Sequence, residues 1–89
     1  MIDKNNLKLK KLKKNPSIKV IIPAYNESQS IAKVIKDLPK SVDEVVVTDN
    51  NSTDNTAEQA KSAGATVCFE PRMGYGYACL KAMDYIASQ

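Results

Sequence analysis

Apolar runs alternate with amphipathic segments along this chain, and the alternation predicts strands that are each followed by a helix. We expect strands at the three apolar runs, which are residues 18–22, 44–48 and 65–69. After the first run, apolar residues recur at helical spacing, and they are Ile31, Val34, Ile35 and Leu38. Ser28 is the predicted N-cap of this helix, and Pro39 is predicted to end it.

Two further helices are predicted after the second and third runs. One begins at about Thr53 and ends at Gly64, a residue suited to a left-handed C-cap. Its small residues are Ala57, Ala60 and Ala63. The last helix begins at about Tyr75. Its buried side is predicted to be Cys79, Ala82, Met83 and Ile86.

This alternation predicts an α/β fold in which parallel strands are joined by right-handed crossovers and helices cover the sheet faces. Residues 18–22, apart from Lys19, and residues 45–47 form near-continuous apolar runs, as strands buried on both faces do. We expect three parallel strands in the order 3-2-1, as in half of a Rossmann-like nucleotide-binding sheet. The first strand then forms an apolar edge, which favours self-association.

Polar clusters follow the first two strands at the points where the strands end. Pro23-Ala24-Tyr25-Asn26-Glu27 comes after the first strand, and Asp49 and Asn50 come after the second. Open α/β sheets bind ligands at the carboxyl ends of neighbouring strands. The sequence therefore predicts one crevice shared by Tyr25, Glu27 and Asp49.

A third cluster, Arg72-Met73-Gly74-Tyr75-Gly76, precedes the last predicted helix. A guanidinium offers a bidentate fork to a phosphate, and the N–H groups of a helix end add donors. Arg72 and Gly74 are therefore candidates for a diphosphate site. The alternative is an exposed surface arginine beside a tight turn.

The three clusters, in this order and at this spacing, resemble the opening half of a large inverting glycosyltransferase family. They are residues 23–27, 47–54 and 70–78, and the resemblance extends over residues 18 to 87. This family, glycosyltransferase family 2, has the nucleotide-sugar-binding GT-A fold and includes the dolichyl-phosphate mannose and glucose synthases. The resemblance implies binding of a UDP- or GDP-linked sugar, for transfer to a lipid phosphate or a saccharide.

The resemblance also suggests roles for the residues after the first strand. Tyr25 is the candidate for stacking on the nucleobase, with backbone groups of Pro23 and Ala24 beside the base. Glu27 is the candidate acceptor for a ribose hydroxyl. The alternatives are a half-buried tyrosine that caps the sheet and a carboxylate that the start of a helix favours.

Asp49 ends an apolar strand, where a carboxylate is unfavourable unless it accepts hydrogen bonds. A ring N–H of uracil or guanine is such a donor, and the resembling family uses this acidic position on the base. Many members have a second acidic residue where this chain has Asn50, so either Asp49 or Asn50 is the base contact. Residues 51–54 are expected to shape a turn and start the next helix.

The resembling family holds a divalent metal, Mg or Mn, with an Asp-x-Asp that this sequence does not contain. The chain has 89 residues, whereas the family's catalytic domain is over twice as long. We assign no catalytic residue and no metal ligand to the chain, and we expect it to be inactive alone. The alternatives are a non-catalytic, truncated or partner-dependent module, and a fragment of a sugar-nucleotide pyrophosphorylase, whose glycine-rich loop is replaced by residues 23–27.

Charge distinguishes a basic tail, residues 1–16, from the predicted domain, residues 17–89. Six lysines against Asp3 give the tail +5, so the whole-chain charge of +3 leaves −2 for the domain. The tail is a candidate for contact with an anionic membrane surface, and a flexible solvated extension is the alternative that its irregular leucines favour. Nucleic acid is not an expected partner, because no aromatic residue interleaves the lysines.

Composition is that of an ordinary globular chain, with 43% hydrophobic and 26% charged residues. No apolar run is long enough to span a bilayer, and the lysine-rich start lacks the apolar core of a signal peptide. We therefore expect a cytoplasmic protein, which is peripheral at the membrane if the tail binds there.

Overall fold

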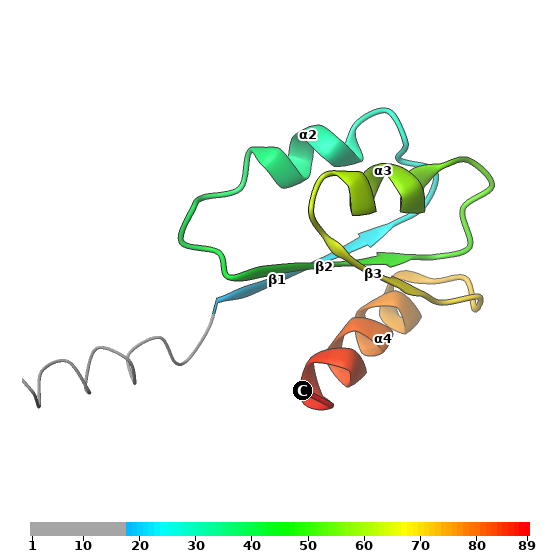
Figure 1. The fold of residues 1–89 in the computed structure, drawn as a ribbon. Helices are drawn as coiled ribbons and strands as arrows, with labels where there is room; N and C mark the ends of the chain where they lie inside the picture. The colour runs from blue at the N-terminus through cyan, green and yellow to red at the C-terminus, as the bar shows by residue number, and fades with distance from the viewer. Residues whose placement is uncertain (1–17) are drawn as a thin grey trace, which may run out of the picture.

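Strands and helices alternate in the computed structural model, which describes residues 18–89 (Figure 1). The elements are β1 (Lys19–Ala24), α2 (Ile31–Lys36), β2 (Glu44–Asp49), α3 (Thr56–Ser62), β3 (Thr66–Phe69) and α4 (Tyr75–Ala87). The predicted alternation is therefore confirmed. The basic tail and its membrane contact lie outside the described residues.

The strands form one parallel sheet with β2 in the middle. Val47 of β2 is the register partner of Ile22 on β1 and of Val67 on β3. Read from β3, this is the predicted order 3-2-1. α2 and α3 lie over one face of the sheet and α4 lies over the other (Figure 1), so the predicted α/β class is confirmed.

The central strand supplies the core on both faces of the sheet. Val47 is fully buried and packs in one cluster with Ile31 of α2 and Ala60 of α3. Successive strand residues point to opposite faces, so the buried Val46 faces α4. Ala78 of α4 is also fully buried, and its small side chain lets the helix lie close to the sheet.

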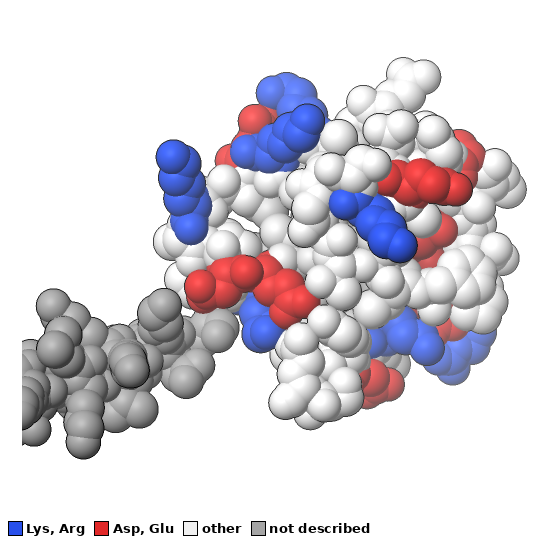
Figure 2. All heavy atoms as spheres, viewed as in Figure 1, with Lys and Arg blue, Asp and Glu red and all other residues white. Residues whose placement is uncertain are grey.

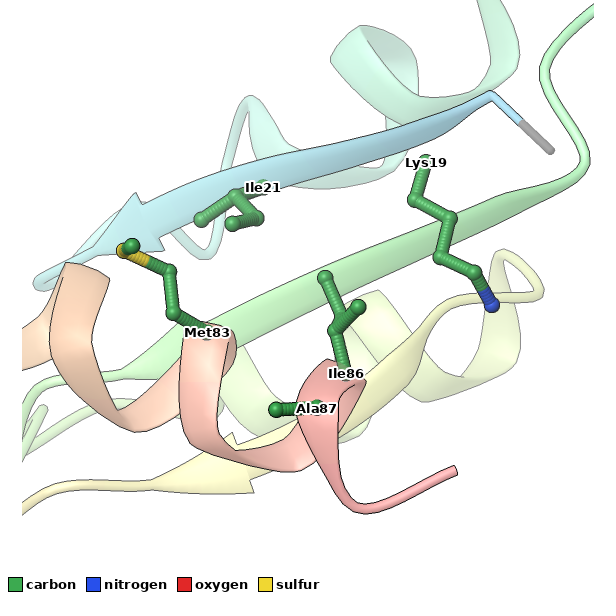
Figure 3. A pocket seen from close by; sticks show the side chains of 5 residues that line it. All are labelled: Lys19, Ile21, Met83, Ile86 and Ala87. Carbon is green, nitrogen blue, oxygen red and sulfur yellow. The ribbon is translucent and has the colours of Figure 1, made fainter. Parts of the chain in front are cut away.

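β1 has a strand partner on one side only, and most of it is half-buried. Between β1 and α4 lies a mainly apolar hollow of about 520 Å³, into which side chains of both elements point (Figure 3). It is lined by Lys19, Ile21, Met83, Ile86 and Ala87. The prediction that Met83 is buried is wrong, because this side chain lines the hollow and is 53% exposed. Self-association through the edge of β1 stays a prediction.

The ends of α2 and the start of α3 differ from the prediction, and the loops before these two helices are joined by a hydrogen bond. α2 has Ser30 as its N-cap, so the prediction of Ser28 is wrong. The Ser28 N–H instead donates to Asp54 Oδ2 at 3.3 Å. α3 begins at Thr56, later than predicted, and α2 ends at Lys36, before Pro39.

The other predicted ends are closer. Gly64 follows α3 with a φ of 104°, the left-handed conformation expected of its C-cap. α4 begins at Tyr75 as predicted. On its inner side Ala82 is buried, whereas Cys79 and Ile86 are half-buried.

Glu44, the first residue of β2, ties all three strands to α4 at the amino-terminal edge of the sheet. Its carboxylate accepts hydrogen bonds from Lys19 Nζ at 2.8 Å, Thr66 Oγ1 at 2.8 Å and the Tyr85 hydroxyl at 2.9 Å. The bonds from Lys19 and Thr66 lower the pKa of Glu44 to about 2. The Lys19 ammonium therefore lies against this carboxylate.

Charges of both signs are interspersed on the face that Figure 2 shows. Of the 13 basic and 10 acidic side chains, six lysines and Asp3 belong to the tail, which leaves seven basic and nine acidic in residues 18–89. Among these residues, no helix is long and apolar enough to cross a membrane.

Shortening Val47 tests the core. Val47→Ala removes methyl groups from a site without solvent exposure, and we expect the free energy of unfolding to fall by about 2 kcal/mol. Val34→Ala is the matched control, because Val34 is 44% exposed on α2 and its loss should change that free energy by less than about 0.5 kcal/mol. Urea unfolding followed by circular dichroism measures both. Equal losses would contradict the central position of Val47.

Candidate functional site

Backbone hydrogen bonds tie the carboxyl ends of the strands together. Ala24 and Asp49 end β1 and β2 and are register partners. The Asn50 N–H donates to the Ala24 carbonyl at 2.8 Å, and the Glu70 N–H donates to the Asp49 carbonyl at 3.0 Å. The segments that leave the three strands therefore start from one edge of the sheet, as the predicted crevice requires.

The side chain of Asn50 joins the end of β2 to the loop between β3 and α4. Its Nδ2 donates to the carbonyls of Glu70 at 2.9 Å and Arg72 at 2.8 Å, and its Oδ1 accepts from the Gly74 N–H at 2.9 Å. Both N–H donors of the amide are thus used, and the residue is 6% exposed. Asn50 therefore braces the loop, and its contact with a base stays a prediction.

Asp49 keeps more of its acceptor capacity. The residue is 7% exposed, and its Oδ1 accepts the Ser52 N–H at 3.1 Å. Among residues 18–89, that N–H is the only donor bonded to this carboxylate. An almost buried carboxylate with unused acceptor sites favours a ligand that donates an N–H. Of the two candidates for the base contact, Asp49 is the better fitted.

Side chains join the loop after β1 to the loop after β2. The Asn26 N–H donates to Ser52 Oγ at 2.8 Å, and Asn26 Oδ1 accepts the Thr53 N–H at 2.8 Å. Beside them, the Glu27 N–H donates to Thr56 Oγ1 at 2.8 Å. Asn26 has no role in the sequence-based prediction. Its φ of 52° is left-handed, and asparagine adopts this conformation more readily than most residues.

Tyr25 and Glu27 both lie exposed on the loop after β1, as ligand contacts must. Tyr25 is 46% exposed. Glu27 Oε1 accepts the Ser30 hydroxyl at 3.1 Å. The alternative role of Glu27 as a carboxylate in the first turn of a helix is wrong, because α2 begins at Ile31 with no acidic residue in its first turn. Glu27 also lines a hollow of about 210 Å³ together with Pro23 and Ala24. The Ala24 carbonyl is already used within the sheet.

Arg72 is held by the buried Glu70 and reaches the surface beside it. Arg72 Nε donates to Glu70 Oε2 at 2.9 Å, and Arg72 Nη2 donates to Oε1 at 3.1 Å. The guanidinium lies over the ring of Tyr77, 4.4 Å from its centroid. The hydrogen bonds from Arg72 lower the pKa of Glu70 to about 2. Arg72 is thus fixed by a charged partner and by an aromatic face.

Gly74 contributes through its backbone. Its φ of 139° lies in the region that favours glycine, and an added Cβ would lie 3.4 Å from Tyr77 Cδ2. Its carbonyl accepts the Ala78 N–H at 3.1 Å and so begins α4. Because its own N–H bonds to Asn50, Gly74 shapes the turn and does not offer this N–H to a phosphate.

Direct contacts therefore join Asn50, Arg72 and Gly74 at the edge where Asp49 ends its strand, and Tyr25 lies on an adjoining loop. Within residues 18–89, no group of three His, Cys, Asp or Glu side chains could hold a metal ion. A divalent metal does not fit this set of residues. The edge offers a carboxylate acceptor, an exposed aromatic ring and a fixed cation, which together suit a ligand with a base and an anionic group.

Comparison with known proteins identifies the family of this chain. Residues 19–89 match the sequence profile of a family described as glycosyl transferase family 2. The chain belongs to glycosyl transferase family 2. The resemblance carried by its three motifs is thereby confirmed, and so is the GT-A fold that the family implies.

Two relatives are similar to this chain in sequence over 62 residues. Protein RfbJ of Shigella flexneri is 52% identical over 62 residues, which are 67% of this chain and 48% of RfbJ. An uncharacterized glycosyltransferase of Mycobacterium tuberculosis is 45% identical over 62 residues, which are 70% of this chain and 28% of that protein.

A solved structure shares the fold. The crystal structure of glucosyl-3-phosphoglycerate synthase from Mycobacterium tuberculosis, in complex with Mn²⁺, UDP-glucose and glycerol 3-phosphate, matches with a TM-score of 0.72 and 31% identity. The match covers 86% of this chain and 32% of the synthase. The chain therefore spans about half of RfbJ and about a third of the synthase, so the activities of such whole proteins are proposals for it.

Removing the Asn50 amide should loosen the loop before α4. Asn50→Ala leaves two carbonyls and the Gly74 N–H without their partner, and we expect a loss of about 2 kcal/mol in the free energy of unfolding. Hydrogen exchange of the Gly74 amide should become faster. Asn55→Ala is the control, since Asn55 is exposed and its side chain forms no capping hydrogen bond. Unchanged Gly74 exchange in Asn50→Ala would contradict the bracing role.

Acid should destabilise the fold partly through Glu70. Its pKa is about 2 in the folded chain against an ordinary 4.5, so its ionised form stabilises the fold above pH 4.5. This contribution is lost as the pH falls from 4.5 toward 2. Glu70→Gln should therefore flatten the pH dependence of the unfolding free energy in that window, as measured by urea unfolding. Glu58→Gln, at an exposed position on α3, should keep the wild-type slope; equal slopes in all three proteins would refute the prediction.

Proposed function

We propose that this chain forms the donor-nucleotide half of a family 2 glycosyltransferase and binds a nucleoside diphosphate at the carboxyl edge of its sheet. The observation that carries the proposal is that the almost buried Asp49 ends its strand at the edge where the side chain of Asn50 holds the loop that carries Arg72. Asn50 follows Asp49 directly and holds the Arg72 carbonyl at 2.8 Å. The carboxylate can accept a ring N–H, and the fixed guanidinium can bind a diphosphate. Asn50 connects the two segments that carry them.

The loop after β1 supplies the proposed base and ribose contacts. Tyr25 stacks on the nucleobase, and the carboxylate of Asp49 accepts the ring N–H. Pro23 and Ala24 lie beside the base, and Glu27 accepts from a ribose hydroxyl. The exposure of Tyr25 and Glu27, and the hollow that Pro23, Ala24 and Glu27 line, support this placement.

The loop before α4 supplies the proposed diphosphate contact. Arg72 binds the diphosphate, and Gly74 permits the turn that carries it. Structures of the synthase that share this fold contain UDP or UDP-glucose. UDP is therefore the first nucleotide to test, and GDP is the second candidate.

A divalent metal is not part of the proposed nucleotide contact. Several of the synthase structures contain Mn²⁺. Residues 18–89 offer no cluster for such an ion, so we propose that their binding of a nucleotide needs no metal. Mg or Mn stays an expectation for whole enzymes of the family.

Sugar transfer needs groups that residues 18–89 do not place at this edge. We expect the 89-residue chain alone to be inactive or nearly so, because the described residues include no cluster that could hold a metal ion. The acceptor, a lipid phosphate or a saccharide, stays a prediction, as does a cytoplasmic location at the membrane surface.

Calorimetric titration with UDP, GDP and their sugar conjugates, with and without Mn²⁺, tests this function. We expect binding that does not depend on the metal and that Asp49→Ala weakens by about tenfold or more, because a hydrogen bond to a charged group is lost. Asp37→Ala is the matched control, since Asp37 follows the last residue of α2 and forms an exposed ion pair with Lys33. A folded chain that binds no nucleotide would overturn the proposal.

A further inference from the structure

Glu70 is a buried carboxylate whose backbone and side chain are both held by hydrogen bonds. The residue is 1% exposed. Its N–H donates to the Asp49 carbonyl at 3.0 Å, and its carbonyl accepts from Asn50 Nδ2 at 2.9 Å. Its side chain accepts the backbone N–H of Arg72 at 2.8 Å and the two bonds from the guanidinium. A buried carboxylate is costly unless its acceptors are used, and Arg72 satisfies both oxygens of this one.

The geometry of this pair leaves one edge of the guanidinium unused. A guanidinium can present a bidentate fork along its Nε–Nη2 edge or along its Nη1–Nη2 edge. Glu70 occupies the first edge, and Nη1 has no hydrogen-bond partner among residues 18–89. Tyr77 covers one face of the group. The Arg72 side chain is 63% exposed, so its second fork remains available to a ligand.

We propose that Glu70 is a positioning residue, which aims the unused fork of Arg72 at the diphosphate while Tyr77 holds the guanidinium plane. This inference rests on the proposed function. A bidentate phosphate contact requires a fork of fixed orientation. Because Glu70 and Tyr77 fix the guanidinium before the ligand arrives, little side-chain freedom remains to be lost on binding.

The positioning role predicts an effect opposite in sign to that of charge alone. A carboxylate beside an anion site repels the anion, so neutralising Glu70 should tighten binding if the residue contributed only its charge. If Glu70 orients Arg72, Glu70→Gln should weaken binding. Glutamine keeps one carbonyl acceptor but places an NH₂ group against a guanidinium donor, so the Nε–Nη2 fork loses its partner.

Nuclear magnetic resonance of the full chain, titrated with uridine, UDP and inorganic pyrophosphate, separates these cases. In the wild type we expect a slowly exchanging Arg72 Nε–H signal, which Glu70→Gln should lose. Glu70→Gln and Arg72→Lys should bind UDP and pyrophosphate about tenfold more weakly and bind uridine as before. Glu58→Gln removes the same charge from an exposed site on α3 and should behave as the wild type.

Each outcome decides one of the two claims. If Glu70→Gln binds UDP as tightly as the wild type or more tightly, or loses uridine binding equally, the positioning role is overturned. If this variant does not fold, Tyr77→Leu replaces it, and diphosphate binding at the wild-type level again overturns the role. Wild-type binding of pyrophosphate without any nucleotide refutes the proposed function but not the positioning role, and binding of neither refutes both.

Discussion

The carboxyl edge of this sheet depends on one amide, the side chain of Asn50. Its backbone is fixed where the central strand ends, and its side chain makes three hydrogen bonds to the loop before α4. Only a group that both donates and accepts can satisfy two carbonyls and an N–H together. The conformation of residues 70–74 therefore follows from a side chain about twenty positions earlier in the chain. Arg72 and Gly74 take their places because of it.

The order of the elements and the parallel sheet could be predicted because they follow from local periodicity. Helix ends could not, since they depend on bonds between loops distant in sequence. Ser28 has the chemistry of an N-cap, but its N–H bonds to the side chain of Asp54, which is 26 residues away in the sequence. Met83 was predicted to be buried because helical spacing identifies the side that faces the sheet. Spacing does not indicate where the sheet ends, and β1 is its last strand beside Met83.

From the residue types, the kinds of chemical group at the site could be predicted. The partner that each side chain bonds could not. Asp49 and Arg72 bear the acceptor and the cation that their positions suggested. Asn50 was an equal candidate for a ligand contact, because the sequence shows only a polar residue at a strand end. It does not show whether that side chain bonds a nucleobase or a neighbouring loop. Glu70 was overlooked, although an acidic residue two positions before an arginine was a visible signal. Only a count of donors and acceptors in three dimensions separates these roles.

The hydrogen bonds of Asn26 make the loops after β1 and β2 one mechanical unit. Neither loop can change shape without breaking bonds that fix the other. The polypeptide therefore loses the conformational freedom of both loops together as it folds. A small molecule that touches both meets a surface already ordered, so its affinity is not reduced by a disorder-to-order transition. At this edge the two loops are held in place by bonds to each other before any ligand is present.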